Sequence, residues 1–64
     1  MKLKLVHINH GAYYVRGLDN DMCHSYRDGD QWIAIMDSQD YKVWGDTPTQ
    51  AVNKCLANYD LKLG

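Results

Sequence analysis

The chain has 64 residues, which is enough for one domain spanning residues 1–64 with a small core. Its composition, 45% hydrophobic and 23% charged, argues against disorder, and a net charge of −1 excludes a strongly basic or acidic protein. No apolar run approaches the ~18 residues of a membrane-spanning helix, and Lys4 and His7 interrupt the start of the chain where a signal peptide would be apolar. We therefore expect a cytoplasmic protein with no membrane association.

The first third of the chain predicts a β-hairpin. Residues 2–8 mix β-branched and aliphatic residues with polar ones, as strands do, and residues 13–16 are rich in strand formers. Asn9, His10 and Gly11 form the expected turn between them. A polar loop over residues 17–21 follows.

The middle of the chain predicts further strands. Residues 22–27 indicate a weaker strand, and Asp28-Gly29 is a dipeptide typical of tight hairpin turns. Residues 31–37 indicate a strand that pairs with residues 41–45 across a short loop at residues 37–40.

The C-terminal segment predicts an amphipathic helix over about residues 48–60. Thr47 is the expected N-cap, Pro48 suits the first helical position, and Gln50 completes a capping box. The apolar side comprises Val52, Cys55, Leu56 and Tyr59, with Ala51 at its border, and the side expected to meet water comprises Asn53, Lys54, Ala57 and Asn58. Residues 61–64 are expected to form a short tail. The order of elements predicts an α+β fold in which an antiparallel sheet of four to five strands, in two hairpins, packs one face against this helix.

Strand alternation predicts which side of the hairpin 31–45 remains uncovered. One side carries Trp32, Ala34 and Met36 opposite Tyr41, Val43 and Gly45, and its small residues favour contact with the helix. The other side carries Ile33, Ile35, Lys42 and Trp44, and Lys42 indicates that this side faces solvent. These four residues are the predicted partner-binding site, because exposed apolar patches often mark interaction surfaces. Two alternatives are that the N-terminal hairpin or a second copy of the chain covers this patch.

A nucleic-acid interface is the alternative function. Residues 1–16 carry three cations and no acid, and the candidate binding residues are Lys2, Lys4, Tyr13, Tyr14 and Arg16. The acidic middle of the chain and the near-neutral total charge argue against it.

Neither a metal centre nor a catalytic site is expected. The candidate ligands lack the paired spacing of zinc sites; they are His7, His10, Cys23, His24 and Cys55. Cys55 falls on the apolar side of the helix, and Cys23 is only adjacent to His24, which makes no nucleophile–base pair. Reduced thiols are the expectation for a cytoplasmic protein, with a single disulfide between Cys23 and Cys55 as the alternative. The sequence therefore predicts no enzyme, no metal and no cofactor.

The segment from Trp32 through Trp44-Gly45-Asp46-Thr47-Pro48 to Val52 resembles small phage and prophage accessory proteins, which have a two-stranded unit followed by a GDTP-type helix start. It is also similar to the HicB-type antitoxins, although their proline-glycine turn is missing and their DNA-binding domain does not follow within these residues. In size and plan the chain resembles early phage inhibitors of host RNA polymerase. The resemblance implies a phage-encoded protein that acts by binding, and no functional residue is carried over from it. We therefore expect a small non-catalytic module that inhibits or modulates a host protein in the host cytoplasm.

Overall fold

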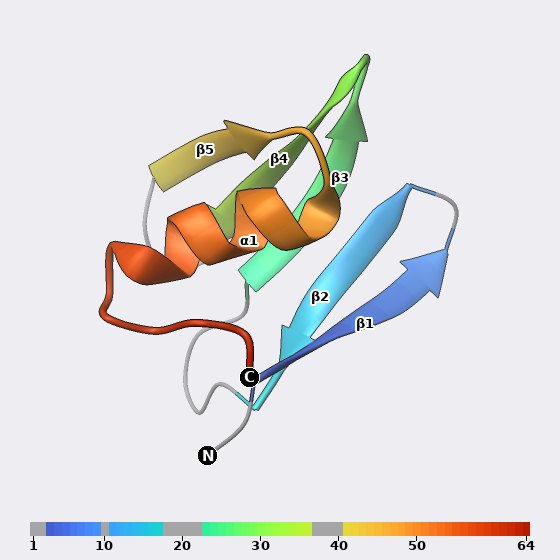
Figure 1. The fold of residues 1–64 in the computed structure, drawn as a ribbon. Helices are drawn as coiled ribbons and strands as arrows, with labels where there is room; N and C mark the ends of the chain where they lie inside the picture. The colour runs from blue at the N-terminus through green and yellow to red at the C-terminus, as the bar shows by residue number, and fades with distance from the viewer. Residues whose placement is uncertain (1–2, 10, 18–22, 37–40) are drawn as a thin grey trace.

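A computed structural model describes residues 3–9, 11–17, 23–36 and 41–64 of the chain. Its elements are β1 (Lys4–Asn9), β2 (Ala12–Arg16), β3 (Cys23–Asp28), β4 (Gln31–Met36), β5 (Tyr41–Gly45) and α1 (Pro48–Ala57). The five strands form one antiparallel sheet in the order β1-β2-β3-β4-β5, and α1 lies across one face of it (Figure 1). The predicted α+β fold is confirmed, whereas the expected turns and loops at residues 10, 18–22 and 37–40 lie outside the described residues.

The turn between β3 and β4 differs by one residue from the prediction. Asp28 pairs with Gln31, so the two-residue turn consists of Gly29 and Asp30 rather than Asp28 and Gly29. Gly29 has a φ of 63° at the first turn position, where hairpin turns often require glycine. In the first hairpin, Asn9 likewise belongs to β1, because it pairs with Ala12.

The start of α1 follows the capping pattern of the sequence. The N–H of Gln50 donates to Oγ1 of Thr47 at 3.1 Å, and Pro48 is the first helical residue. The side chain of Gln50 reaches back one residue further than a capping box requires, since its Oε1 accepts the N–H of Asp46 at 3.1 Å. The first of these bonds satisfies an N–H group that the first turn of a helix leaves without a partner, and the second satisfies the N–H of the residue before the N-cap.

The regular helix ends at Ala57, shorter than the predicted range to residue 60, because the last residues form a closing turn. The N–H of Leu61 bonds to the carbonyl of Leu56, and the N–H of Asp60 bonds to the carbonyl of Ala57. This is the pattern of a Schellman motif, and Asp60 occupies its left-handed position with a φ of 59°. The motif turns the chain back toward the sheet.

The C-terminal tail is attached to the sheet. Leu63 forms a parallel bridge with Leu3, and the N–H of Gly64 donates to the carbonyl of Leu3 at 3.0 Å. The N–H of Leu63 donates to Oδ1 of Asn53 at 2.9 Å. Asn53 is therefore half-buried and holds the tail, whereas the sequence pattern placed it in water. The tail runs from the end of α1 to the start of β1 (Figure 1).

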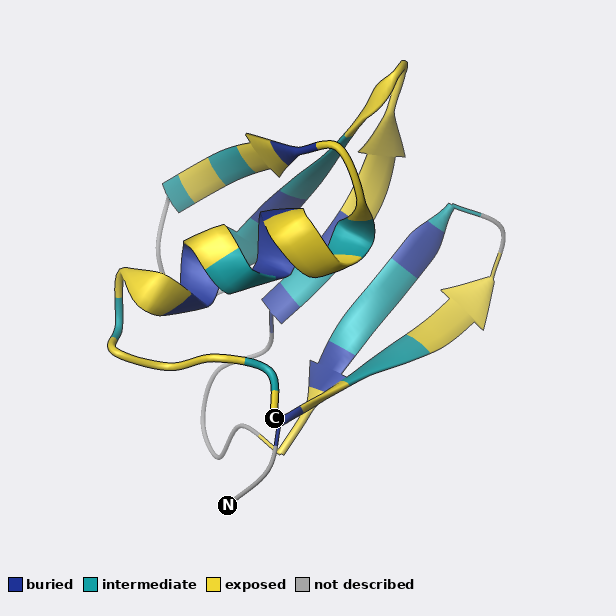
Figure 2. Cartoon of the chain, viewed as in Figure 1, coloured by how far each residue is buried: buried dark blue, intermediate teal, exposed yellow. Residues whose placement is uncertain are grey.

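The core lies between α1 and the sheet, with the strongest helix contacts on β5, β4 and β3. In Figure 2 the side of α1 that faces the sheet is buried and its outer side is exposed, and β2 carries further buried residues, Ala12 and Val15. Most core residues are small or medium-sized, and they are Leu3, Val15, Cys23, Ala34, Met36, Ala51, Val52, Cys55 and Leu56. Gly45 lets the helix approach closely, since a Cβ there would lie 2.6 Å from the backbone N of Ala51.

Candidate binding surface

The sheet has one face that α1 does not cover. Buried Cys23, Ala34 and Val15 point toward the helix, so their strand neighbours point to the opposite side. We call this side the open face, and the described strand register assigns to it Lys4, Val6, Ala12, Tyr14, Arg16, His24, Tyr26, Asp28, Gln31, Ile33, Ile35, Lys42 and Trp44. The N-terminal hairpin extends the sheet edge to edge through β2 and β3, so it does not cover this face as one alternative supposed.

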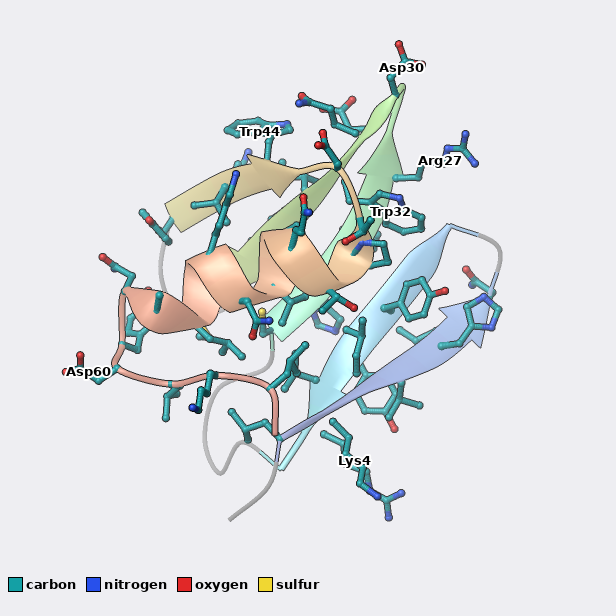
Figure 3. The ribbon with its side chains drawn as sticks, viewed as in Figure 1. Lys4, Arg27, Asp30, Trp32, Trp44 and Asp60 are labelled. Atoms are coloured by element: carbon teal, nitrogen blue, oxygen red, sulfur yellow. The ribbon has the colours of Figure 1, made fainter. Side chains whose placement is uncertain are left out.

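All four residues of the predicted partner-binding site lie together on the open face. Ile33 pairs with Trp44, and Ile35 pairs with Lys42, as strand alternation predicted. Trp44 is 43% exposed, and both isoleucines are half-buried. Figure 3 shows Trp44 projecting from the side of β5 away from α1.

The register adds three aromatic rings to this group. Tyr14 is opposite His24, which is opposite Ile35, and Tyr26 is opposite Ile33. Tyr26 is 42% exposed, and its ring stacks on that of His24 with centroids 6.0 Å apart. We call the set Tyr14, His24, Tyr26, Ile33, Ile35 and Trp44 the aromatic patch. Sequence reasoning missed Tyr14, His24 and Tyr26 as members, although the position of small Ser25 between the rings of His24 and Tyr26 was a usable signal.

Trp44 has a fixed orientation on this surface. Its indole Nε1–H donates to Oδ2 of Asp28 at 3.0 Å, which joins β5 to the end of β3 across β4. From α1, Nζ of Lys54 donates to the backbone carbonyl of Trp44 at 3.0 Å. Hydrogen bonds within the chain thereby hold both the ring and the backbone of Trp44 in place before any binding partner is present.

Charges lie around the aromatic patch. Lys4 pairs directly with Arg16, which places two cations side by side at the end of β1 and β2. Lys42 lies at the β5 edge, while Asp28 lies at the opposite end of the strands from Lys4 and Arg16. The open face is therefore apolar at its centre, cationic at one corner and anionic at the far end.

The sheet separates the residues of the nucleic-acid alternative. Lys4, Tyr14 and Arg16 share the open face, but Tyr13 lies on the helix side, where its ring contacts Trp32 edge-on at 5.4 Å and His7 at 5.0 Å. Lys2 lies outside the described residues. The five residues named for this alternative therefore do not form one surface.

Three further features bear on function: metal-ligand clusters, membrane-spanning helices and the buried thiols. Within the described ranges, no three His, Cys, Asp or Glu side chains are grouped as a metal site would require. The described part of the chain also contains no helix of the length and apolarity needed to cross a membrane. Burial raises the pKa of the Cys55 thiol, an effect that its hydrogen bond with Cys23 partly offsets.

Comparison with known proteins gives no relative: no family model, curated protein or solved structure matches this chain.

Proposed function

We propose that this domain is a non-catalytic protein-binding module and that the open face is its binding surface. The observation that carries the proposal is the aromatic patch, which α1 leaves uncovered because it packs on the opposite side of β3, β4 and β5. An apolar centre with a charged rim is the usual anatomy of a protein–protein interface. Tryptophan, tyrosine and arginine are the residues that most often supply the binding energy of such interfaces.

The hydrogen bond between Trp44 and Asp28 supports a role for Trp44 as the central anchor. A side chain already held in its bound orientation loses less conformational entropy when a partner binds. The bond also satisfies the indole N–H, so the partner needs to supply only an apolar pocket for the ring.

The resemblance of the segment from Trp32 to Val52 to phage accessory proteins supports a more specific proposal. In this proposal the chain is phage-encoded, acts in the host cytoplasm, and inhibits or modulates a host protein by occupying one of its surfaces. The charges around the aromatic patch favour a partner with carboxylates opposite Lys4 and Arg16.

Nucleic-acid binding is the second candidate, because Lys4, Tyr14 and Arg16 lie on the same face as Tyr26 and Trp44. Bases could stack on these rings while the two cations contact phosphates. The carboxylate of Asp28 at the far end of the face would repel a long phosphate backbone, which is why we place this candidate second.

The test is affinity capture from a bacterial lysate with three forms of the tagged domain, each with and without nuclease. The forms are wild type, Trp44→Ala and Leu61→Ala. Leu61 is a matched control because its side chain is also exposed (38%) but belongs to the C-terminal tail rather than the open face. We expect one protein to be captured in stoichiometric amount by wild type and Leu61→Ala after nuclease treatment, and to be lost with Trp44→Ala.

Other outcomes separate the alternatives. Retention of the protein by Trp44→Ala would exclude the open face as its binding surface. Signal that disappears with nuclease, together with affinity for an oligo-dT probe that falls steeply with salt, would favour the nucleic-acid candidate. A concentration-dependent dimer in sedimentation that Trp44→Ala disrupts would assign the open face to a second copy of the chain.

A further inference from the structure

The two cysteines of the chain meet inside the core, on the side of the sheet away from the proposed binding surface. Cys23 is the first residue of β3, and Cys55 lies in the third turn of α1. Both side chains are fully buried, neither cysteine is in a disulfide, and the thiol of Cys55 is hydrogen-bonded with that of Cys23. Residues far apart in sequence thereby place two sulfur atoms in contact at the helix–sheet interface.

We propose that Cys23 and Cys55 form an oxidisable pair, in which a low-molecular-weight disulfide such as oxidised glutathione converts the two thiols into an intramolecular disulfide that ties α1 to β3. This proposal is independent of the binding function of the open face. It assigns a covalent modification to a site that otherwise serves only as part of the core.

The reaction is a pair of thiol–disulfide exchanges. One cysteine loses its proton and attacks oxidised glutathione, forming a mixed disulfide and releasing one glutathione. The thiolate of the second cysteine then attacks the protein sulfur of that mixed disulfide and releases the second glutathione. The protein loses two electrons and two protons, and one oxidised glutathione becomes two reduced molecules, so the exchange is balanced.

Burial determines when the two cysteines can react. Neither sulfur is accessible while α1 packs on the sheet, and burial raises the pKa of the Cys55 thiol, which disfavours the thiolate. Attack on an external disulfide therefore requires transient opening of the helix–sheet contact. When the helix closes again, the second thiol lies beside the first. The mixed disulfide should therefore be short-lived and the intramolecular disulfide should be the product.

The disulfide is expected to stabilise the fold. It closes a loop of about 30 residues, and a link of that span removes much of the freedom of the unfolded chain. For a domain of this size, the melting temperature should rise by roughly 10–20 °C. The open face lies on the other side of β3, so oxidation should leave binding through the aromatic patch unchanged.

The test is to incubate the folded, reduced domain with excess oxidised glutathione and to follow intact mass, peptide mapping and thermal unfolding. We expect the loss of two hydrogen atoms, a peptide linking Cys23 to Cys55, and a melting temperature that rises and returns to its original value with dithiothreitol. Cys23→Ala and Cys55→Ala should each give only a glutathione adduct. Because either variant can unfold, the decisive comparison is between the oxidised and reduced forms of the wild-type chain.

Three results would overturn the proposal. One is a stable glutathione adduct on the wild-type protein. Another is a native sample that stays reduced while the same chain in urea forms the disulfide. The third is an oxidised form whose melting temperature is unchanged or lower, since that would mean that the disulfide does not fit the native core.

Discussion

The two faces of the sheet are built from the same strands but have opposite chemistry. On the covered face the residues at the centre of the contact with α1 are small and buried, such as Ala34 and Gly45, and the larger Trp32 and Tyr41 pack around them, partly buried. On the open face their immediate neighbours, Ile33 and Trp44, are large and partly exposed. Residues one position apart therefore differ in environment: one set packs in the core, and the other belongs to the proposed binding surface.

The largest effect is expected from Gly45→Ala, which tests how closely the covered face fits the helix. The new Cβ would lie 2.6 Å from the N and 3.0 Å from the Cα of Ala51, and backbone atoms cannot move aside alone. We expect a loss of about 3 kcal/mol in the free energy of unfolding, measured by urea denaturation. That is most of the stability of a domain this small.

Gly29→Ala is the control for this substitution. Gly29 has a φ of 63° but no atom within 4 Å of a Cβ, so only backbone strain is introduced, at a cost of about 1 kcal/mol. Equal losses for the two variants would mean that the helix does not approach β5 as closely as the structure shows.

Ser25→Ala is expected to raise stability by about 1–2 kcal/mol, because it removes a polar group that the covered face does not satisfy. Ser25 is fully buried, and its hydroxyl has no hydrogen-bond partner among the described residues. Thermal unfolding of the variant beside wild type measures the change. A lower melting temperature would show that the hydroxyl makes a hydrogen bond in solution.

Raising the pH should lower the free energy of unfolding through the buried thiol of Cys55. Burial raises the pKa of this thiol above that of the unfolded chain, so the folded protein keeps a proton that the unfolded chain has released. The resulting stability is fully present below the unfolded pKa and is lost as the pH rises through the folded pKa. Urea denaturation between about pH 8 and pH 10, a range that begins below the ordinary thiol pKa, should show a decline under reducing conditions that is shallower in Cys55→Ala. If stability fell equally with pH in wild type and Cys55→Ala, ionisation of the buried thiol would not be the cause of the decline.

The smallest change in stability is expected from Trp44→Ala, although it should have the largest effect on binding. The ring is partly exposed and its loss leaves no cavity in the core, so the free energy of unfolding should fall by about 1 kcal/mol or less. Denaturation measured by circular dichroism avoids the loss of the fluorophore. A loss as large as that for Gly45→Ala would mean that the open face also maintains the fold.

Local patterns in the sequence predicted most of the fold and part of the site. The start of α1 was predictable because it is determined by groups close in sequence, those of Thr47, Pro48 and Gln50. Alternation within residues 31–45 likewise placed Ile33 and Trp44 on one side of the sheet. β2 and β3 are separated in sequence by residues 17–22, so no local pattern fixes how they pair. The sequence therefore did not reveal that Tyr14 lies on the open face and Tyr13 on the helix side. The bond of Asn53 to Leu63 and the meeting of Cys23 with Cys55 also join distant segments, and no local pattern indicates either.

The most direct test of the central claim is a map of amide chemical-shift changes when the protein captured by the wild-type domain is purified and added to the labelled domain. We predict that the changes concentrate on the strands around Tyr14, Tyr26, Ile33 and Trp44, with little change on the outer side of α1 at Lys54 and Ala57. Changes confined to α1, with the aromatic patch unaffected, would contradict this prediction and would assign binding to the helix.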